Sequence, residues 1–440
     1  MNPAERGHRF RASPPAQQGA ALLITLALVG IVGGMAIVWV AQSGASEARR
    51  VQDTAKAMGM IRDALVARAA SDFNRPGSLP CPDYNNDGSA DGSLCTAPYV
   101  GRVPWKTLDL PDLRDATGER FWYALSPTFR DHPNACTPTP CVLNSDTPAD
   151  LTINGVASQE NVAIIFAPGE PLGSQDRDPS VPANLTNPAN YLEGNNVPTG
   201  PSDKDYQTGG AAATFNDRAL VITRNMLMPA IEQRVARQAR QCLEKFAASG
   251  GGRYPFAAPL SDVTTFNDVP TPLYGRIPMV LDDTDSILGT AGWPPDDMQD
   301  PGRAGTEDCF RVGAPPTDPS WWDSWRELLL YRVSVAYAPG ESGDCSIDPC
   351  LTVNSNGTVK FVVIVAGRTL ASPDQSLRAS IKFNPAYYLE AAPNPPTYNN
   401  SNFSGGGFLG KRPLAVVSGP LGGFNDRLEC ASESGAAPCD

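Results

Sequence analysis

The chain has 440 residues, which is too long for one ordinary hydrophobic core and suits two domains of about 150 to 200 residues after an N-terminal segment. It contains 43 Pro and 40 Gly with 41% hydrophobic residues, a composition that favours short strands and many turns. The formal net charge of −12 argues against nucleic acid as a partner, because phosphate binding needs a basic face. It favours cations over anions as ligands.

An uncharged apolar segment covers residues 20–41. At about 1.5 Å per helical residue it would reach roughly 33 Å, enough to cross the hydrocarbon core and longer than the apolar region of a secretory signal. Three arginines and one glutamate precede it, so the positive-inside tendency places residues 1–19 in the cytoplasm. The sequence therefore predicts a spanning helix with the bulk of the chain exported.

Two amphipathic helices are expected next. In the first, apolar residues recur at steps of three and four: Val51, Ala55, Met58, Ile61, Leu65, Ala69 and Phe73. In the second the same spacing joins Ile231, Val235, Ala239, Leu243 and Phe246, with Pro229 near the start and Gly250 past the end. After each helix the pattern shortens to strands such as 162–167 and 361–366.

The chain contains an internal repeat. Asp115, Glu119, Tyr123 and Ser126 match Asp323, Glu327, Tyr331 and Ser334 at one offset. Five further segments recur in the same order: YVGRVP (99–104) as LYGRIP (273–278), CTPTPC (136–141) as CSIDPC (345–350), VAIIFAPG (162–169) as FVVIVAGR (361–368), NPANYLEG (187–194) as NPAYYLEA (384–391), and FNDR (215–218) as FNDR (424–427). Chance similarity would not keep six separate segments in the same order, so the sequence predicts a duplicated domain. The repeated Asn-Pro-Ala and Phe-Asn-Asp-Arg segments are interpreted as turn-shaping, with a repeated binding loop as the alternative.

All ten cysteines follow the apolar segment, where an oxidising compartment would let them pair. Local spacing favours Cys81 with Cys95, Cys136 with Cys141, Cys345 with Cys350 and Cys430 with Cys439, which leaves Cys242 with Cys309. Connectivity does not follow from sequence alone. Zinc is disfavoured because no Cys-x-x-Cys pair exists and His132 is the only histidine after the leader.

The stretch DYNNDGSAD is a candidate calcium loop. Asp83, Asn85, Asp87 and Asp91 occupy loop positions one, three, five and nine, and Gly88 stands at position six, where the loop must turn sharply. Position twelve is Leu94, so this is not a full EF-hand. The alternative is an Asn/Asp/Gly turn between Cys81 and Cys95. The second repeat has YPFAAPLSD at the corresponding place and is expected to lack a second site.

The leader ending in Gly19, the apolar helix that runs on into an amphipathic helix, and the following helix-plus-sheet unit resemble the type IV pilin and type II secretion pseudopilin superfamily. The resemblance rests on residues 17–73, and LPCPDYNNDG and GRVPWKTLDLPD also resemble exported prepilin-like proteins. It implies cleavage by a prepilin peptidase between Gly19 and Ala20 and N-methylation of Ala20. It also implies an inner-membrane subunit that meets other pilins through its N-terminal helix. A plain single-pass anchor, or a signal-peptidase cut after Ala41, is the alternative.

One departure from the family is informative. Most members carry Glu at mature position five, where this chain has Ile24. Minor pseudopilins of the K type, which sit at filament tips, also lack that Glu, and a double head would crowd a lattice of major subunits. The resemblance therefore favours a minor or tip subunit.

The expected fold is α+β and disulfide-rich, with a long N-terminal transmembrane and amphipathic helix followed by two tandem pilin-like domains of helix plus antiparallel sheet. The expected divisions are a cytoplasmic leader (1–19), the N-terminal helix (20–73, with 20–41 spanning the membrane), a first head (74–225) and a second head with its own helix (226–440).

No enzymatic chemistry is predicted, because His132 is the one possible exported histidine base and no carboxylate pair or phosphate loop stands out. The aromatic cluster Trp321, Trp322 and Trp325 is expected to place at least one ring in the core and one or two on the surface for adhesion. The external ligand is not predicted. Rival hypotheses are a stand-alone anchored envelope binding protein of adhesin type and an exported hydrolase.

Overall fold

The computed structural model describes residues 47–92, 95, 99–131, 142–200, 203–210, 212, 214–249, 251–266, 269, 272–279, 321–354, 356–370, 375–389, 400, 407–408, 425–433 and 435. The chain divides into two compact units, residues 1–56 and residues 57–440. The predicted leader, the peptidase site at Gly19 and Ala20, and the apolar segment 20–41 lie outside the described residues. Within the described part, no helix is both long and apolar enough to cross a membrane.

The N-terminal helix spans residues 47–71. Its predicted apolar stripe is confirmed at Met58, Ile61, Leu65 and Ala69, which are buried, whereas Ala55 is exposed. The prediction was also wrong at Phe73, which is 58% exposed. The helix ends early because Asp72 Oδ1 accepts hydrogen bonds from the backbone N–H groups of Asn74 and Arg75, which turns the chain away from the helix axis.

Four strands follow in one antiparallel sheet: β1 (Val100–Arg102), β2 (Trp122–Leu125), β4 (Asn161–Ala167) and β6 (Arg218–Thr223), in the order β1-β2-β4-β6. Strand β4 is apolar and buried almost throughout, as expected for a central strand. Two short strands, β3 (Thr152–Ile153) and β5 (Asp205–Tyr206), pair in parallel beside it as a separate two-stranded sheet.

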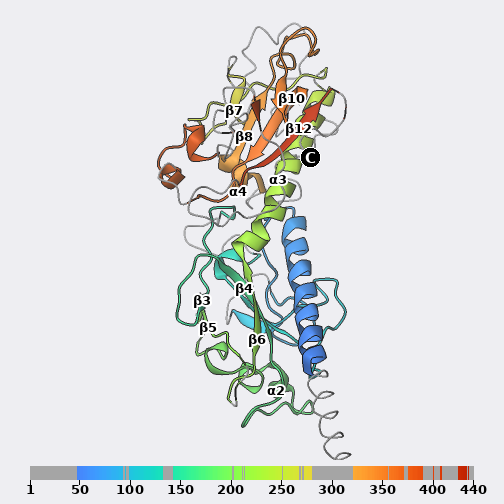
Figure 1. The fold of residues 1–440 in the computed structure, drawn as a ribbon, viewed down its shortest axis with the longest axis vertical. Coiled ribbons are helices and arrows are strands. Elements are labelled where there is room, and N and C mark those ends of the chain that lie inside the picture. The colour runs from blue at the N-terminus through green and yellow to red at the C-terminus, as the bar shows by residue number, and fades with distance from the viewer. Residues whose placement is uncertain are drawn as a thin grey trace, which may run out of the picture. The chain divides into compact units, whose positions relative to one another are not determined.

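Helix α3 (Arg224–Ser249) begins directly after β6. Its predicted apolar stripe is confirmed, because Ile231, Val235, Ala239, Leu243 and Phe246 are all buried. A second sheet then contains β7 (Tyr274–Arg276), β8 (Leu329–Val333), β10 (Asn356–Val365) and β12 (Arg427–Ser432). In the same sheet β9 (Leu351–Val353) pairs with β10, and β11 (Gly407–Phe408) pairs with β9. Figure 1 shows β8, β10 and β12 side by side. The β9–β11 pair is parallel, so this sheet is not wholly antiparallel as expected.

Short helices connect these elements: α2 (Pro182–Thr186), α4 (Trp321–Trp325) and the 3₁₀ turns η1 (Pro127–Phe129), η2 (Pro188–Asn190), η3 (Gly194–Asn196), η4 (Arg326–Leu328), η5 (Gln375–Leu377) and η6 (Pro385–Tyr387). The turns η2 and η6 start at Asn187 and Asn384, whose side chains accept the N–H two residues later. Repeated Asn-Pro-Ala segments therefore build the same turn twice.

The two main sheets share one strand order, since β7-β8-β10-β12 repeats β1-β2-β4-β6 and each set follows a helix. The registers agree as well: Gly101 pairs with Tyr123, and Gly275 pairs with Tyr331. We call residues 57–223 the first lobe and residues 224–440 the second lobe. The broad expectation of a mixed α+β fold with an N-terminal helix is confirmed.

Two predicted disulfides are present. Cys81 bonds to Cys95 and Cys345 bonds to Cys350, with Cα atoms 5.2 and 5.3 Å apart. Cys242 and Cys430 are also disulfide-bonded. Their expected partners Cys309 and Cys439, and the expected pair Cys136 and Cys141, lie outside the described residues.

Candidate functional site

The candidate calcium loop is organised by its own side chains. Asp83 Oδ2 accepts the N–H of Gly88 at 2.7 Å, and its Oδ1 accepts the N–H of Asp87 at 3.2 Å. Asp91 Oδ2 accepts the N–H of Asn85 at 2.9 Å, while Asn85 Nδ2 donates to Asp91 Oδ1 at 2.8 Å. The loop therefore closes on itself through side-chain acceptors for backbone N–H groups.

Neighbouring residues hold the loop from outside. Gly88 has φ +90°, and a β-carbon there would lie 2.6 Å from the Trp105 ring, so glycine is required at the sharp turn. Lys106 donates from its backbone N–H to Gly88 O at 2.7 Å and from Nζ to Asp87 O. Arg120 donates to Asn86 O at 3.0 Å and to Asn86 Oδ1 at 2.8 Å.

The pKa values of Asp83 and Asp87 are shifted in opposite directions. Burial raises the pKa of Asp83, and the nearby charges of Asp87 and Asp91 raise it further, against the opposing effect of its N–H donors. Asp87 is solvent-exposed, and the N–H of Ser89 lowers its pKa. Asp83 is thus the buried acidic residue of the loop, and its side chain holds the turn at Asp87 and Gly88.

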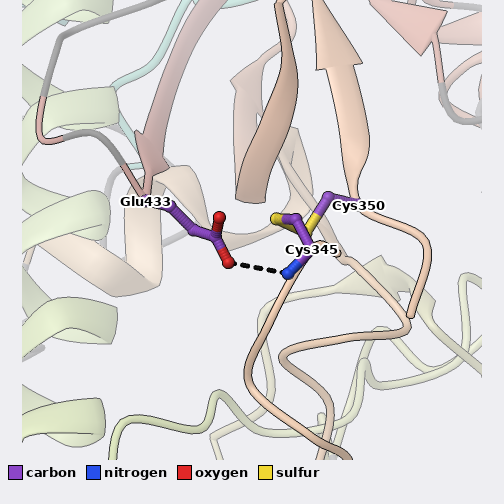
Figure 2. A group of neighbouring side chains, drawn as sticks. All are labelled: Cys345, Cys350 and Glu433. Atoms are coloured by element: carbon purple, nitrogen blue, oxygen red, sulfur yellow. Dashed lines mark hydrogen bonds between the residues drawn. A yellow bond between two sulfur atoms is a disulfide. The ribbon is translucent and has the colours of Figure 1, made fainter. Parts of the chain in front are cut away.

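The three carboxylates of this loop do not converge on one point. Within the described residues, one group of three acidic or sulfur side chains has ligand atoms within 4.8 Å of one another, and it is Cys345, Cys350 and Glu433. Figure 2 shows that its two sulfurs are joined as a disulfide and that Glu433 Oε1 accepts the N–H of Cys345, at 2.7 Å. Disulfide sulfurs are not thiolate ligands, so this group is a braced loop and not a metal centre.

Calcium binding by residues 83–91 stays a prediction. Isothermal titration calorimetry of the full chain with CaCl2 checks it, and the prediction expects a binding heat that Asp87→Asn abolishes, because that substitution removes one ligand charge. Asp178→Asn, another exposed loop carboxylate, is the control and should keep the heat. Absence of heat in the unsubstituted chain would leave the loop as a turn.

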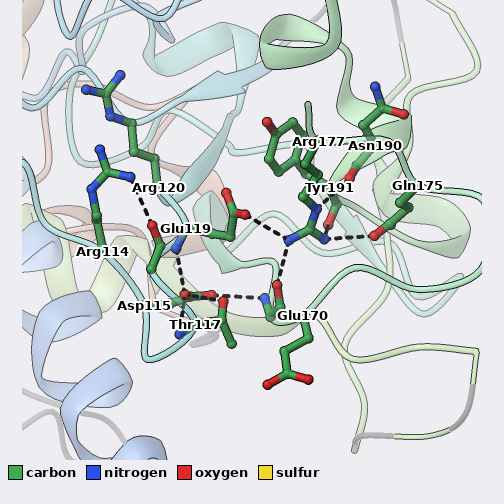
Figure 3. Close-up of polar contacts among 12 residues, drawn as sticks. Arg114, Asp115, Thr117, Glu119, Arg120, Glu170, Gln175, Arg177, Asn190 and Tyr191 are labelled. Atoms are coloured by element: carbon green, nitrogen blue, oxygen red, sulfur yellow. Dashed lines mark hydrogen bonds and ion pairs between the residues drawn. The ribbon is translucent and has the colours of Figure 1, made fainter. Parts of the chain in front are cut away.

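A second polar cluster surrounds Arg177 in the first lobe (Figure 3). Its guanidinium donates to Asn190 O at 2.7 Å, to Gly169 O at 2.6 Å and to Gln175 Oε1 at 2.7 Å, and it lies 3.5 Å from a carboxylate oxygen of Glu119. These contacts join the repeated segments 162–169 and 187–194.

Asp115 supports the same cluster. Its Oδ1 accepts hydrogen bonds from the backbone and hydroxyl of Thr117 and from the N–H of Glu119, and its Oδ2 accepts the N–H of Gly169 at 2.9 Å. Asp115 thus fixes the turn at 115–119 and holds it against Gly169.

Two buried arginines were missed as site residues. Arg102 contacts the rings of both Trp122 and Tyr191, 4.4 and 3.9 Å from their centroids, and donates to the carbonyls of Arg120 and Leu185. Burial lowers its pKa to about 10. Arg276 in the second lobe repeats the arrangement with Glu327 O, Lys382 O and the Tyr388 ring. The signal was present, since Gly-Arg precedes Val-Pro or Ile-Pro in both repeats.

Two buried acids meet where the segments 187–194 and 215–218 join. Asp217 Oδ2 accepts the N–H of Glu193 at 2.9 Å and Asn196 Nδ2 at 2.8 Å, while Glu193 Oε2 accepts the N–H groups of Asn216 and Asp217. Burial raises the pKa of Asp217 to about 8, and the Glu193 carboxyl contributes to the rise. This pair was not singled out in sequence, because its burial depends on the tertiary fold.

The aromatic prediction was partly wrong. Trp321, Trp322 and Trp325 are all buried, so none is available on the surface for adhesion. The reason is packing: the Trp321 and Trp322 rings contact edge to face at 5.9 Å, and Trp322 Nε1 donates to Met279 Sδ. His132 lies outside the described residues.

Comparisons with protein-family models, with curated proteins and with solved structures found no match. The function is therefore inferred from the chain's own residues.

Proposed function

We propose that the chain is a prepilin-like minor subunit of a type IV pilus or a type II secretion pseudopilus. Its hydrophobic N-terminal helix would insert in the inner membrane and pack against other pilins after cleavage by prepilin peptidase. Its double head would be exposed in the periplasm or outside the cell, at a filament tip, for assembly priming or for contact with a surface or substrate. We propose no enzymatic activity.

One observation carries this proposal: the sequence runs without a proline from the apolar segment 20–41 into the helix that packs in the first lobe. Residues 20–71 contain no proline, and the helix 47–71 covers the later part of that stretch. Its Ile61, Leu65 and Ala69 belong to the same hydrophobic core as Tyr123 and Ile165 of the first sheet. A long apolar helix that leads into a helix-on-sheet head is the arrangement that pilin-like subunits require.

The repeated strand order supports the double head. Each main sheet follows a helix and uses the same order and the same Gly–Tyr register. We therefore propose two tandem pilin-like domains, 74–225 and 226–440, of which the second lacks its own membrane segment. Two heads on one membrane helix would fit a subunit present in few copies.

Processing at Gly19 tests the proposal. Mass spectrometry of the chain expressed together with a prepilin peptidase should find an N-terminus at Ala20 carrying one methyl group. Gly19→Ala is the matched variant and should impair removal of the leader, because the peptidase cuts after a glycine in the family that this chain resembles. The mature chain should also copurify with sheared filaments.

Two outcomes would oppose the proposal. An intact leader together with absence from filaments would support the stand-alone anchored binding protein. An N-terminus at Gln42 would instead show a signal-peptidase cut after the apolar segment.

A further inference from the structure

The first repeat carries an insertion, residues 142–150, that the second repeat lacks at the corresponding place. Both contain a Leu-Thr segment that starts a short strand, β3 in the first lobe and β9 in the second, and both strands pair in parallel with a later strand. Asn154 and Asn354 follow these strands with φ +52° and +48°, and donate to Tyr206 O and Phe408 O. In the second repeat Leu351 follows Cys350 directly, whereas residues 142–150 separate Cys141 from Leu151 in the first.

The inserted residues contact the second lobe. Asn144 Nδ2 donates to Ser324 O at 2.8 Å, and the N–H of Leu143 donates to Ser324 Oγ at 3.4 Å. Ser145 Oγ donates to Glu232 Oε1 on α3 at 2.7 Å, with both side chains buried. Buried polar groups need hydrogen-bond partners, and the partners of Asn144 and Ser145 belong to the second lobe. The insertion is therefore packed against the second lobe as well as the first.

Within the insertion, Asp146 forms an ion pair with Arg378 of the second lobe. Its Oδ1 accepts the backbone N–H and the hydroxyl of Thr369, each at 2.8 Å, and its two oxygens lie 3.0 and 3.1 Å from Arg378 Nη1. Arg378 is 4% exposed. A buried guanidinium is costly without a carboxylate, so Asp146 supplies a charge that the second lobe needs.

The corresponding arginine of the first lobe, Arg177, pairs with a carboxylate of its own lobe. Arg177 and Arg378 make matching bonds to the carbonyls of Gly169 and Gly367, but Arg177 pairs with Glu119 of its own lobe. In the second lobe the counterpart of that residue, Glu327, bonds to Lys382 instead. The arginine of the first lobe thus pairs within its lobe, whereas the corresponding arginine of the second lobe pairs with Asp146 of the first lobe.

The connection between the lobes adds to this contact. Strand β6 ends at Thr223 and α3 starts at Arg224, so no linker separates them. Arg224 donates to Thr147 O within the insertion at 2.9 Å and pairs with Glu160, which also pairs with Arg368 of the second lobe.

We propose that residues 142–150 are an interlobe strap that fixes the two lobes as one rigid body, with Asp146 as its main contact. Without the strap, the lobes would remain joined at residues 223 and 224 but would move more independently. This inference does not depend on the pilin-like function.

Hydrogen exchange of the full chain in detergent tests the strap. In Asp146→Asn, peptides that contain Thr369 should exchange at least tenfold faster than in the unsubstituted chain, because the amide keeps an oxygen for the Thr369 N–H but loses the charge that holds Arg378 at this contact. A deletion of 142–150, which joins Cys141 to Leu151 as the second repeat joins Cys350 to Leu351, should also divide thermal unfolding into two transitions.

Asp150→Asn is the matched control. Asp150 belongs to the same insertion but contacts Ser126 and Lys204 of its own lobe, so this variant should leave exchange at Thr369 unchanged. Unchanged exchange in Asp146→Asn, or equal acceleration in both variants, would overturn the proposal. If the deletion variant does not fold, the two single substitutions still decide.

Discussion

Gly275→Ala is expected to lower the free energy of unfolding by about 3 kcal/mol or more. A β-carbon at Gly275, in β7, would fall 1.9 Å from the carbonyl oxygen of Ala258. That oxygen accepts the N–H of Arg276 at 2.8 Å, and the Ala258 N–H donates to Arg276 O at 3.0 Å. Because the clashing atom belongs to the backbone, no side-chain rotation relieves the overlap, and the two segments must separate.

Two other glycines give matched comparisons. Gly101 is the counterpart in the first lobe, where an added β-carbon would lie 2.8 Å from Pro82 Cβ and 2.9 Å from Asp83 O, so Gly101→Ala should cost about 1 to 3 kcal/mol. Gly357 in β10 has its nearest atom 3.8 Å away, and Gly357→Ala should change stability by less than about 0.5 kcal/mol. Urea denaturation followed by circular dichroism measures all three. Equal midpoints for Gly275→Ala and Gly357→Ala would contradict the close-approach argument.

The helices and the repeat could be predicted from sequence because their signals are local or ordered. Apolar spacing identified the buried face of α3 residue by residue, and local spacing favoured the two short-range disulfides that are present. The end of the first helix could not be predicted in this way, since periodicity continues to Phe73 while the Asp72 side chain stops the helix.

Contacts between segments far apart in the chain could not be predicted from the sequence. Arg102 meets the carbonyl of Leu185, and Asp146 meets Arg378, only because the fold brings together residues far apart in the chain. The same holds for the tryptophan cluster, whose composition alone suits either a core or an adhesive surface. The candidate calcium residues were located as one loop, but their hydrogen bonds to backbone N–H groups depend on a conformation that spacing does not specify.

The buried acid pair makes stability depend on pH. The folded pKa of Asp217 is about 8, well above the ordinary value of 3.8 that it has in the unfolded chain. Below about pH 4 both states hold the proton, and the favourable contribution of the raised pKa is complete. As the pH rises from there towards 8, the unfolded chain gives up the proton while the folded chain keeps it, so stability falls by up to about 1.4 kcal/mol per pH unit from this group.

Asp217→Asn should remove that dependence. An amide keeps an oxygen to accept the N–H of Glu193 and the Asn196 side chain, which Asp217 Oδ2 now accepts, and it carries no charge at any pH. The variant should therefore match the unsubstituted chain near pH 4 and exceed its stability at pH 8, as measured by urea denaturation at each pH. Asp178→Asn, an exposed carboxylate with a lowered pKa, should leave the slope between pH 5 and 8 unchanged. A slope that persists in Asp217→Asn would place the proton on another group, because any group whose pKa is raised on folding produces this sign.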